Sequence, residues 1–468
     1  MSKEIDMSSP WQLGAAELSR AFTLRGLSPV DAIDDLLARI ARLDPKLHAF
    51  VEVYGAEARL AAEAADKAIR AGQAVGPLHG VPVALKDLID LEGRITMGGS
   101  AALRERRSTV TATIAKRMIA QGMVVLGKVH TVEFAMGGWG TNPHLGAPWN
   151  PWDAAIHHTP GGSSSGSGVA VAARLAPWAI GTDTGGSVRL PASFCGITGL
   201  KVTIGRVSRY GIIPLSDTLD TPGPMARSVE DAALLYNVLQ GPDPLDQTTR
   251  GVIADDAMSN LRRGVRGLGL ARMPEAERQG VVPAMLAAYD RAVDVLAGLG
   301  AEIVEIALPF RFADLAAMQA IILAEAYFFN GHLAEDQGAP LDPAVRKRVL
   351  AGARISANEY LRTKTLVQEL KQRFYAAMDG IDALLTPTTE APAIPVAEVD
   401  QDVVPSRFTR FGNLLELCAL AVPNGFTEKN LPLSLQIVCR GYEEATALRI
   451  GQAYQQATDW HRREPPIT

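Results

Sequence analysis

The sequence predicts an α/β fold in which a large mixed sheet is covered by helices on both faces. Two observations lead to this expectation. Short apolar runs of strand length alternate with stretches of helical periodicity along the chain. With 468 residues, of which 47% are hydrophobic and 21% are charged, the chain is also long enough to bury one very large core or two ordinary ones.

Several elements can be placed in chain order. Residues 10–75 carry apolar side chains at three- and four-residue steps, which predicts a helical N-terminal layer. The runs VPVAL at 81–85 and MVVLG at 123–127 have the length and composition of strands, and the helix-like TATIAKRMIAQG lies between them. WAIG at 178–181 and GITGLKV at 196–202 predict two further strands, so the alternation continues.

The second half of the chain is predicted to be more helical. After a strand-like GVRGLGLARM, residues 260–375 are rich in Ala, Leu, Arg and Glu and predict a mostly helical insertion or lobe on the core. DALLTPTTEAPAIP at 382–395 predicts a strand followed by a proline-rich loop, and LPLSLQIV at 431–438 predicts another strand. This C-terminal part is expected to close the sheet.

Charge and composition argue against several classes of function. A formal net charge of −5 and a pI near 6.0 leave no excess of basic charge to neutralise a phosphate backbone, so nucleic acid is not expected as a direct ligand. The N-terminal residues lack an apolar signal segment, and the most apolar stretch, Val169 to Ile180, is interrupted by Arg174 and Pro177. We therefore expect a cytoplasmic protein without a membrane span. Free buried thiols are expected for the three cysteines, Cys195, Cys418 and Cys439.

The segment TPGGSSSGSG, residues 159–168, is a candidate site. Its composition is typical of a flexible linker, but the apolar helical run VAVAARLA follows at once, so the segment lies where a loop enters a helix. It contains no GxxxxGK[ST], and Val171 stands at the position of the third glycine of GxGxxG. Neither nucleotide-binding motif is complete, and the segment offers hydroxyl groups instead.

Gly162 to Gly166 formally match G-x-S-x-G, the nucleophile elbow of α/β-hydrolases, with Ser164 as nucleophile. An esterase of this type needs an acid and a histidine downstream, and only His332 and His461 follow, neither in a recognisable catalytic setting. The eight histidines also show no HExxH or other metal-ligand spacing. The elbow is a weak alternative, and no metal is predicted.

A lysine can replace histidine as a base when burial populates its neutral amine near pH 7. Lys86 fits this requirement because it follows VPVAL, at the end of a predicted core strand, although a lone lysine is usually a surface charge. No serine stands three residues before a lysine, so the serine must come from elsewhere. In GTDTGGSVRLP, residues 181–191, consecutive glycines let backbone N–H groups converge before Ser187, as an oxyanion requires; a tight turn between strands is the alternative.

Together these residues resemble the amidase signature family of Ser-cisSer-Lys amidohydrolases. Residues 160–211 match that family's signature almost throughout, KDLIDLEGRITMGGS at 86–100 is similar to its lysine segment, and the likeness covers about residues 10–460. The resemblance implies an α/β/α sandwich in one domain, 1–468. Its parts are the helical layer at 10–75, a signature core at 76–240, the helical elaboration at 260–375 and the C-terminal part at 376–468.

Carried over to this sequence, the resemblance implies that Ser187 is the nucleophile, Lys86 the base, and Ser163 a bridging serine after a cis peptide bond to Gly162. Neutral Lys86 would draw the proton of Ser163 while Ser163 takes that of Ser187. Ser163 would then protonate the departing amine, and water would hydrolyse the acyl-enzyme with no metal and no cofactor. The oxyanion would be held by the backbone N–H groups of Thr184, Gly185, Gly186 and Ser187.

Departures from the family pattern bear on the substrate. The segment AMGGWGTN, residues 135–142, stands where the A subunits of glutaminyl-tRNA amidotransferases have a serine-rich stretch. This difference implies a different pocket wall, to which Met136, Gly137 and Trp139 are expected to contribute. Met136 and Trp139 are equally candidates for the core. Arg189 is a candidate for binding a substrate carboxylate, or for pinning its own loop through Asp183. Residues 407–426 resemble part of the allophanate hydrolases and favour small polar amides or ureides.

The function expected first is that of a free-standing cytoplasmic amidase that cleaves a small amide or ureide. No direct nucleic-acid partner and no membrane partner are expected, and a homo-oligomer is possible. The acidic net charge and the GGWGTN stretch favour this interpretation. The second interpretation is the glutamine-hydrolysing A subunit of a tRNA-dependent amidotransferase. An esterase that uses Ser164 is a distant third.

Overall fold

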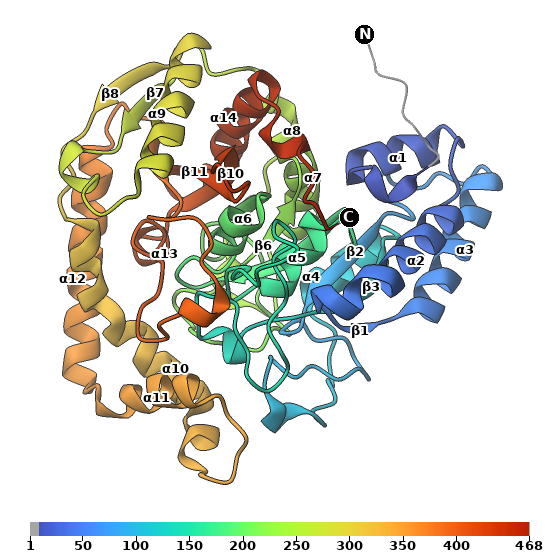
Figure 1. The fold of residues 1–468 in the computed structure, drawn as a ribbon, viewed down its shortest axis with the longest axis horizontal. Coiled ribbons are helices and arrows are strands. Elements are labelled where there is room, and N and C mark those ends of the chain that lie inside the picture. Colours follow the sequence, from blue (N-terminus) through green and yellow to red (C-terminus); the bar gives the residue numbers. More distant parts are fainter. Residues whose placement is uncertain (1–8, 468) are drawn as a thin grey trace.

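One mixed sheet of eleven strands runs through the computed structural model, which describes residues 9–467 (Figure 1). Strand β2 pairs in parallel with β3 and β4, and β7 pairs in parallel with β8 and β9, whereas all the other neighbours are antiparallel. The predicted α/β fold with a mixed sheet is confirmed. The spatial order is β1 (Phe50–Val53), β3 (Val124–Val129), β2 (Pro82–Lys86), β4 (Trp178–Asp183), β6 (Thr221–Ala226), β5 (Thr198–Lys201), β10 (Cys418–Phe426), β11 (Pro432–Cys439), β9 (Ala383–Pro387), β7 (Gly269–Arg272) and β8 (Glu302–Glu305).

Helices form a hydrophobic core on each face of the sheet. The larger core contains side chains from α1 (Ala15–Thr23), α4 (Thr113–Ala120), α7 (Val229–Leu239), α8 (Ala257–Asn260), α9 (Pro283–Gly298), α12 (Ala357–Ala377), α13 (Arg410–Leu414) and α14 (Glu444–Ala457). The second core contains side chains from α2 (Pro29–Leu47), α3 (Gly55–Arg70), α5 (Ser165–Ala172) and α6 (Arg189–Cys195). A smaller third cluster lies around α10 (Ala320–Glu335) and α11 (Pro343–Ala351), at the end of the molecule opposite α1–α3 in Figure 1.

The central strands contribute alternate residues to the two main cores. In β2, Val83 and Leu85 belong to the larger core, whereas Ala84 between them belongs to the second. In β4, Ile180 lies in the larger core and its neighbour Ala179 in the second. Successive side chains of a strand point to opposite faces, so both faces of these strands are covered. This explains why the strands are apolar without a polar alternation.

The structure differs from the expected elements in three places. Strand β1 interrupts the helical layer predicted over residues 10–75, and β8 lies within the stretch expected to be mostly helical, whereas β7 falls in the strand-like GVRGLGLARM as expected. Strands β9, β10 and β11 do not close the sheet at an edge; they join its two halves, and the edges are β1 and β8. The assignment of the whole chain to one domain stays a prediction.

One helical segment among the described residues, Phe312–Glu335, is long and apolar enough to cross a membrane, with a mean hydropathy of 1.4. It combines a 3-10 helix, Phe312–Gln319, with α10. Core helices of globular folds have the same composition, and in this segment Phe312, Ile321 and Ala326 are buried in the hydrophobic clusters. The cytoplasmic location stays a prediction.

Candidate active site

The three predicted catalytic residues lie at one end of two neighbouring strands. Lys86 is the last residue of β2, and β4, its parallel neighbour, ends at Asp183 just before Ser187. Ser163 lies in the loop that enters α5, where the backbone N–H of Ser164 donates to the carbonyl of Ser187 at 3.2 Å. Neighbouring parallel strands have their C-terminal ends on the same side of the sheet. The lysine and the two serine loops therefore converge at the ends of β2 and β4.

Lys86 is fully buried and contacts two hydroxyl groups. Its Nζ lies 2.8 Å from Ser163 Oγ and 2.7 Å from Thr182 Oγ1. Burial lowers the pKa of Lys86 to about 7, while the negative charges of Asp220 and Asp183 act in the opposite direction. A substantial fraction of neutral amine is therefore present near neutral pH.

The serine geometry distinguishes the two candidate nucleophiles. The peptide bond between Gly162 and Ser163 is cis, as the resemblance implied. Ser187 is 7% exposed and lines a cavity, but no hydrogen bond within residues 9–467 joins its hydroxyl to that of Ser163. Ser164 is fully buried, and its hydroxyl accepts from the N–H of Thr182 at 3.1 Å and donates to the carbonyl of the same residue at 3.2 Å. Backbone contacts thus occupy the hydroxyl of Ser164.

The loop from Thr184 to Ser187, called the TGGS loop below, carries the four predicted oxyanion donors, and three of them have a backbone N–H group that is not engaged elsewhere among residues 9–467. Within residues 9–467 the N–H groups of Thr184, Gly185 and Ser187 donate to no other group. The N–H of Gly186 instead donates to Asp183 Oδ1 at 2.8 Å. Gly186 therefore leaves the predicted set of donors, because its N–H is already occupied by a carboxylate.

Arg189 holds the TGGS loop in place and does not reach the substrate cavity. Its side chain is fully buried and forms an ion pair with Asp183 at 2.9 Å, with a second bond from Nε at 3.0 Å. The remaining N–H groups donate to the carbonyl of Thr409, to Gln436 and to Asn413. Every guanidinium donor is used, so the predicted alternative of a substrate carboxylate ligand is wrong and the loop-pinning alternative fits the geometry.

Asp183 responds to the same contacts. Burial alone would raise its pKa, but the charge and hydrogen bonds of Arg189, with a further bond from Asn413, lower it to about 2. Asp183 is therefore ionised at neutral pH and remains a strong acceptor for the N–H groups of Gly186 and Val188.

Ser187 opens into a cavity of about 330 Å³. Met136 and Gly137 line it, as predicted, whereas Trp139 does not: its indole donates to the carbonyl of Val403 and its ring lies near Phe194. Met136 also belongs to a hydrophobic cluster, as its alternative core role implied, and its contact with a substrate stays a prediction. The remaining lining residues include Gln319, Ile322, Leu323, Lys347, Arg348, Asp402, Val404, Ser406 and Arg410.

Three basic lining residues, Lys347, Arg348 and Arg410, were not predicted, and Lys347 is paired with Asp402 at 2.6 Å. Arg410 lies within residues 407–426, the segment singled out by its resemblance, and could have been found there. Arg348 stands in α11, where an arginine in a helical sequence is typical of a solvent-facing position. Its guanidinium instead donates to the carbonyl of Met136 at 2.5 Å and so reaches the cavity wall.

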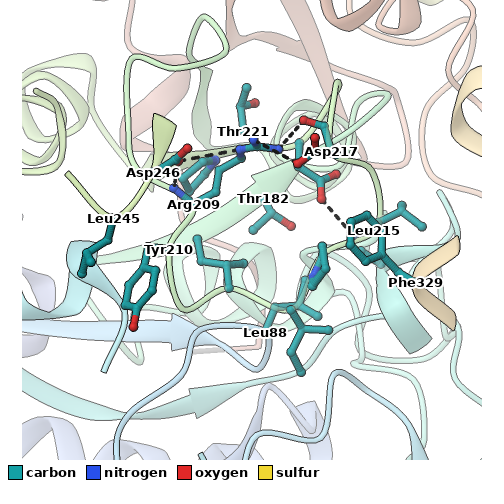
Figure 2. Close-up of a pocket in the computed structure, with 16 residues that line it drawn as sticks. Leu88, Thr182, Arg209, Tyr210, Leu215, Asp217, Thr221, Leu245, Asp246 and Phe329 are labelled. Carbon is teal, nitrogen blue, oxygen red and sulfur yellow. Dashed lines mark hydrogen bonds and ion pairs between the residues drawn. The ribbon is translucent and has the colours of Figure 1, made fainter. Parts of the chain in front are cut away.

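A second cavity, of about 220 Å³, is lined by Thr182, Arg209 and Phe329 among others (Figure 2). It shares Ala135 and Leu215 with the first cavity, and Thr182, the hydrogen-bond partner of Lys86, is on its wall. Arg209 bridges Asp217 and Asp246 across this cavity, at 3.4 and 3.8 Å.

A buried lysine beside a serine, at the ends of inner strands of a mixed sheet, is typical of serine hydrolases in which a lysine replaces histidine. The sequence profile of the Amidase family matches residues 31–448, and the chain belongs to this family, the amidase signature enzymes. It is therefore an enzyme that acts on the C–N bonds of amides.

Its relatives define the chain further. It is 38% identical to the A subunit of the glutamyl-tRNA(Gln) amidotransferase of Chloroflexus aggregans, over 94% of this chain and 95% of that one. The protein of the same name from Halorhodospira halophila is 38% identical over 97% and 99% of the two chains.

Solved structures share the whole fold. One, from a vestigial protein complex that reveals the origins of an s-triazine catabolic enzyme, has a TM-score of 0.89 and 30% identity, and the match covers 95% of this chain and 98% of that one. The native peptide amidase of Stenotrophomonas maltophilia has a TM-score of 0.85 and 32% identity, over 97% and 98% of the chains.

These comparisons correct one expectation and reorder another. The expected set of partners, a small amide or ureide with no direct nucleic acid, is wrong, because the relatives are subunits of an enzyme named for glutamyl-tRNA(Gln). Net charge describes the average surface of one chain and does not limit the assembly in which it works. The A-subunit interpretation is also better supported than the free-standing amidase that was expected first.

Proposed function

We propose that the chain hydrolyses the side-chain carboxamide of glutamine as the A-type subunit of an amidotransferase whose acceptor is glutamyl-tRNA(Gln). The subunit role is supported by relatives of that name, which match nearly the whole chain at 38% identity. The chemistry is carried by one observation, the buried Lys86 Nζ at 2.8 Å from Ser163 Oγ beside the TGGS loop.

In this proposal, neutral Lys86 accepts the proton of Ser163 while Ser163 accepts that of Ser187, whose oxygen attacks the amide carbonyl. Apo geometry leaves the two serine hydroxyls without a hydrogen bond, so substrate binding has to bring them closer. The oxyanion accepts hydrogen bonds from the N–H groups of Thr184, Gly185 and Ser187. Ser163 returns the proton to the departing nitrogen, which releases ammonia and leaves a glutamyl ester on Ser187.

Deacylation uses the same groups in the same order. Water attacks the ester carbonyl, and its proton passes through Ser163 to Lys86. The C–O bond to Ser187 then breaks, glutamate leaves, and Ser187 recovers its proton. Lys86 can serve in both halves because its pKa of about 7 lets it gain and lose a proton near neutral pH.

The cavity wall favours an amide that carries a carboxylate. Arg410 lines the cavity and donates to Ser406 at 2.9 Å, and burial lowers its pKa. Arg348 adds a second guanidinium to the same wall. Guanidinium groups in a partly desolvated pocket bind carboxylates strongly, often by two parallel bonds. An amino-acid amide such as glutamine matches this wall better than an uncharged amide.

A stand-alone amide hydrolase is the second candidate. It is favoured by the backbone similarity to the native peptide amidase of Stenotrophomonas maltophilia, at a TM-score of 0.85. The two candidates share the reaction at Ser187 and differ in the amide that is cleaved and in the need for partner subunits.

Ammonia release by the purified chain separates the candidates. L-Glutamine, its chain-shortened analogue asparagine and uncharged aliphatic and aromatic amides are compared, with the chain alone and after co-expression with the subunits encoded for the same complex. We expect glutamine to be hydrolysed, faster with the partner subunits present, and Ser187→Ala to abolish turnover without changing the melting temperature. Rapid hydrolysis of an uncharged amide by the chain alone, with glutamine inert, would instead establish the second candidate.

A further inference from the structure

Asp220 lies on the wall of the second cavity, next to the lysine site. Thr182, which contacts Lys86, lines the same cavity, as do Leu88 and Phe329 (Figure 2). Asp220 follows the loop after Leu215 and directly precedes β6, the antiparallel neighbour of β4. The strand pairing therefore brings this carboxylate to the end of β4 at which the catalytic residues lie.

Four hydrogen-bond contacts tie Asp220 to the TGGS loop and to its own loop. Its Oδ1 accepts from Thr184 Oγ1 at 2.5 Å, and its Oδ2 accepts from the N–H groups of Leu215 at 2.8 Å and Ser216 at 3.0 Å. Its own N–H donates to the carbonyl of Ser216. Thr184 lines the first cavity, beside Ser187, so the bond from Thr184 to Asp220 crosses from one cavity to the other.

The other carboxylates around Lys86 already have cationic partners. Asp183 is paired with Arg189 at 2.9 Å, and Asp87, the residue after Lys86, is paired with Lys128 at 3.5 Å. Within residues 9–467, no lysine or arginine forms an ion pair with Asp220 at 4 Å or less. Its charge therefore has no ion-pair partner among these residues, and it raises the pKa of Lys86. Burial raises the pKa of Asp220 itself, while its hydrogen bonds and the charge of Arg209 act in the opposite direction.

We propose that Asp220 is a positioning residue for the reaction proposed above: its carboxylate anchors the TGGS loop through Thr184 and supplies negative charge to the Lys86 site. The anchored loop keeps the oxyanion donors in place before substrate arrives. The charge favours the protonated form of Lys86, which is the form that develops during attack. The inference rests on the proposed acyl transfer and would have no meaning if Ser187 were not the nucleophile.

The test uses phenylmethylsulfonyl fluoride, which reports the nucleophilicity of a serine without any knowledge of the substrate. Ser187 Oγ forms a bond to sulfur, fluoride leaves, and the serine proton passes to Lys86 through Ser163. The rate of this reaction is measured from pH 5 to 9 in the full chain, and mass spectrometry locates the adduct. The rate should be constant at high pH, which is called the plateau below. It should decrease at pH values low enough to protonate Lys86, and this decrease is called the acid limb.

Asp220→Asn keeps the shape of the side chain and removes its charge. Without that charge the pKa of Lys86 falls, so we expect the acid limb to move to lower pH by about 0.5 to 1 unit, at or below the low end of the shifts caused by a neighbouring charge. Asp220→Glu keeps the charge but not the fit, so its limb should stay in place while the plateau rate falls. Thr184→Val removes the anchor and keeps the charge, so its plateau should fall about tenfold with an unmoved limb.

Asp217→Asn is the matched control, because Asp217 lines the same cavity but has a 71% exposed side chain and is paired with Arg209. We expect it to change neither the limb nor the plateau. An acid limb in Asp220→Asn that stays at the wild-type pH, with a reduced plateau, would reduce Asp220 to a structural residue and overturn the proposal. If Asp220→Asn does not fold, a wild-type plateau in Thr184→Val or a shifted limb in Asp220→Glu overturns it equally.

Failure of the proposed function gives a different result. An adduct on another serine, or an unchanged rate in Ser187→Ala, would remove the acyl-enzyme itself. An adduct on Ser187 with no movement of the limb in Asp220→Asn would remove only the role of Asp220.

Discussion

Replacing Lys86 by methionine is expected to abolish activity and to stabilise the protein. The lysine is fully buried, and its pKa falls from 10.5 to about 7, a difference that corresponds to about 4 to 5 kcal/mol against the folded state at neutral pH. Methionine has a similar volume and no charge. Its introduction also leaves the hydroxyls of Ser163 and Thr182 without their partner, which costs about 1 to 3 kcal/mol. The net gain at pH 7 is about 1 to 4 kcal/mol.

This gain should depend on pH in a defined direction. At and below pH 7 the unfolded lysine is protonated without penalty, whereas the folded lysine is protonated only against burial, so the wild type bears the whole cost there. Between pH 7 and 10.5 the unfolded state binds more protons than the folded state, so the wild type gains stability as the pH rises. The advantage of Lys86→Met should therefore shrink by about 1.4 kcal/mol per pH unit and reverse before the upper end of this range, where only the cost of the hydroxyls without a partner remains.

The measurement is urea unfolding of both proteins at several pH values from 6 to 10. For a chain of 468 residues, 1 kcal/mol corresponds to about 1 °C in melting temperature, so unfolding free energies are more informative than melting scans. Lys67→Met, at an exposed position of α3, is the control and should change the free energy of unfolding by less than about 0.5 kcal/mol. A Lys86→Met protein that is less stable than the wild type at pH 6 to 7, or a difference that does not vary with pH, would refute the reasoning.

Three further outcomes are expected. Arg189→Met should lower the free energy of unfolding by about 3 to 5 kcal/mol, because it leaves Asp183 charged and buried. The contribution of this pair to wild-type stability should be complete above pH 3.8 and lost as the pH falls through about 2. A loss below about 1 kcal/mol, measured by urea unfolding, would contradict the pinning role. Ser164→Ala should keep at least half of the wild-type turnover and lose about 1 kcal/mol of stability, whereas inactivation would revive the nucleophile elbow. Arg410→Met should raise KM for glutamine about tenfold or more with little change in kcat; an equal effect on the hydrolysis of an uncharged amide would exclude carboxylate binding.

The central part of the fold could be predicted because its strands are continuous apolar runs. Strands β2, β3 and β4 are buried on both faces, so their composition alone separates them from helices and surface loops. Strand β6 could not be found in this way, because TPGPMA contains two prolines and a glycine, which argue against a central strand. The prolines are tolerated because β5 pairs only with the last two residues of β6, Met225 and Ala226.

The site was predictable to the extent that unusual residue types stood in unusual places. Lys86 was identified by a charge at the end of an apolar strand, and the TGGS loop by its paired glycines. The contact of Arg189 with Asp183 was one of the two predicted alternatives. The occupied N–H of Gly186 was not predicted, and the bonds of Arg189 to Thr409, Gln436 and Asn413 could not be, because these partners lie more than 200 residues away in the chain. Arg348 carries no local signal, since only the packing of α11 against the cavity turns it inward.

The groups proposed for bond cleavage and much of the cavity wall lie in different stretches of the chain. Lys86, Ser163, Ser187 and the proposed oxyanion donors fall within residues 86–187, together with Ala135 to Gly138 of the wall, whereas about half of the residues that line the cavity fall within residues 319–410. Mutations can therefore accumulate in the later stretch and redirect the enzyme to another amide while bond cleavage is preserved. Grafting residues 319–410 from a relative with a different substrate onto this chain would accordingly test whether this stretch determines the specificity.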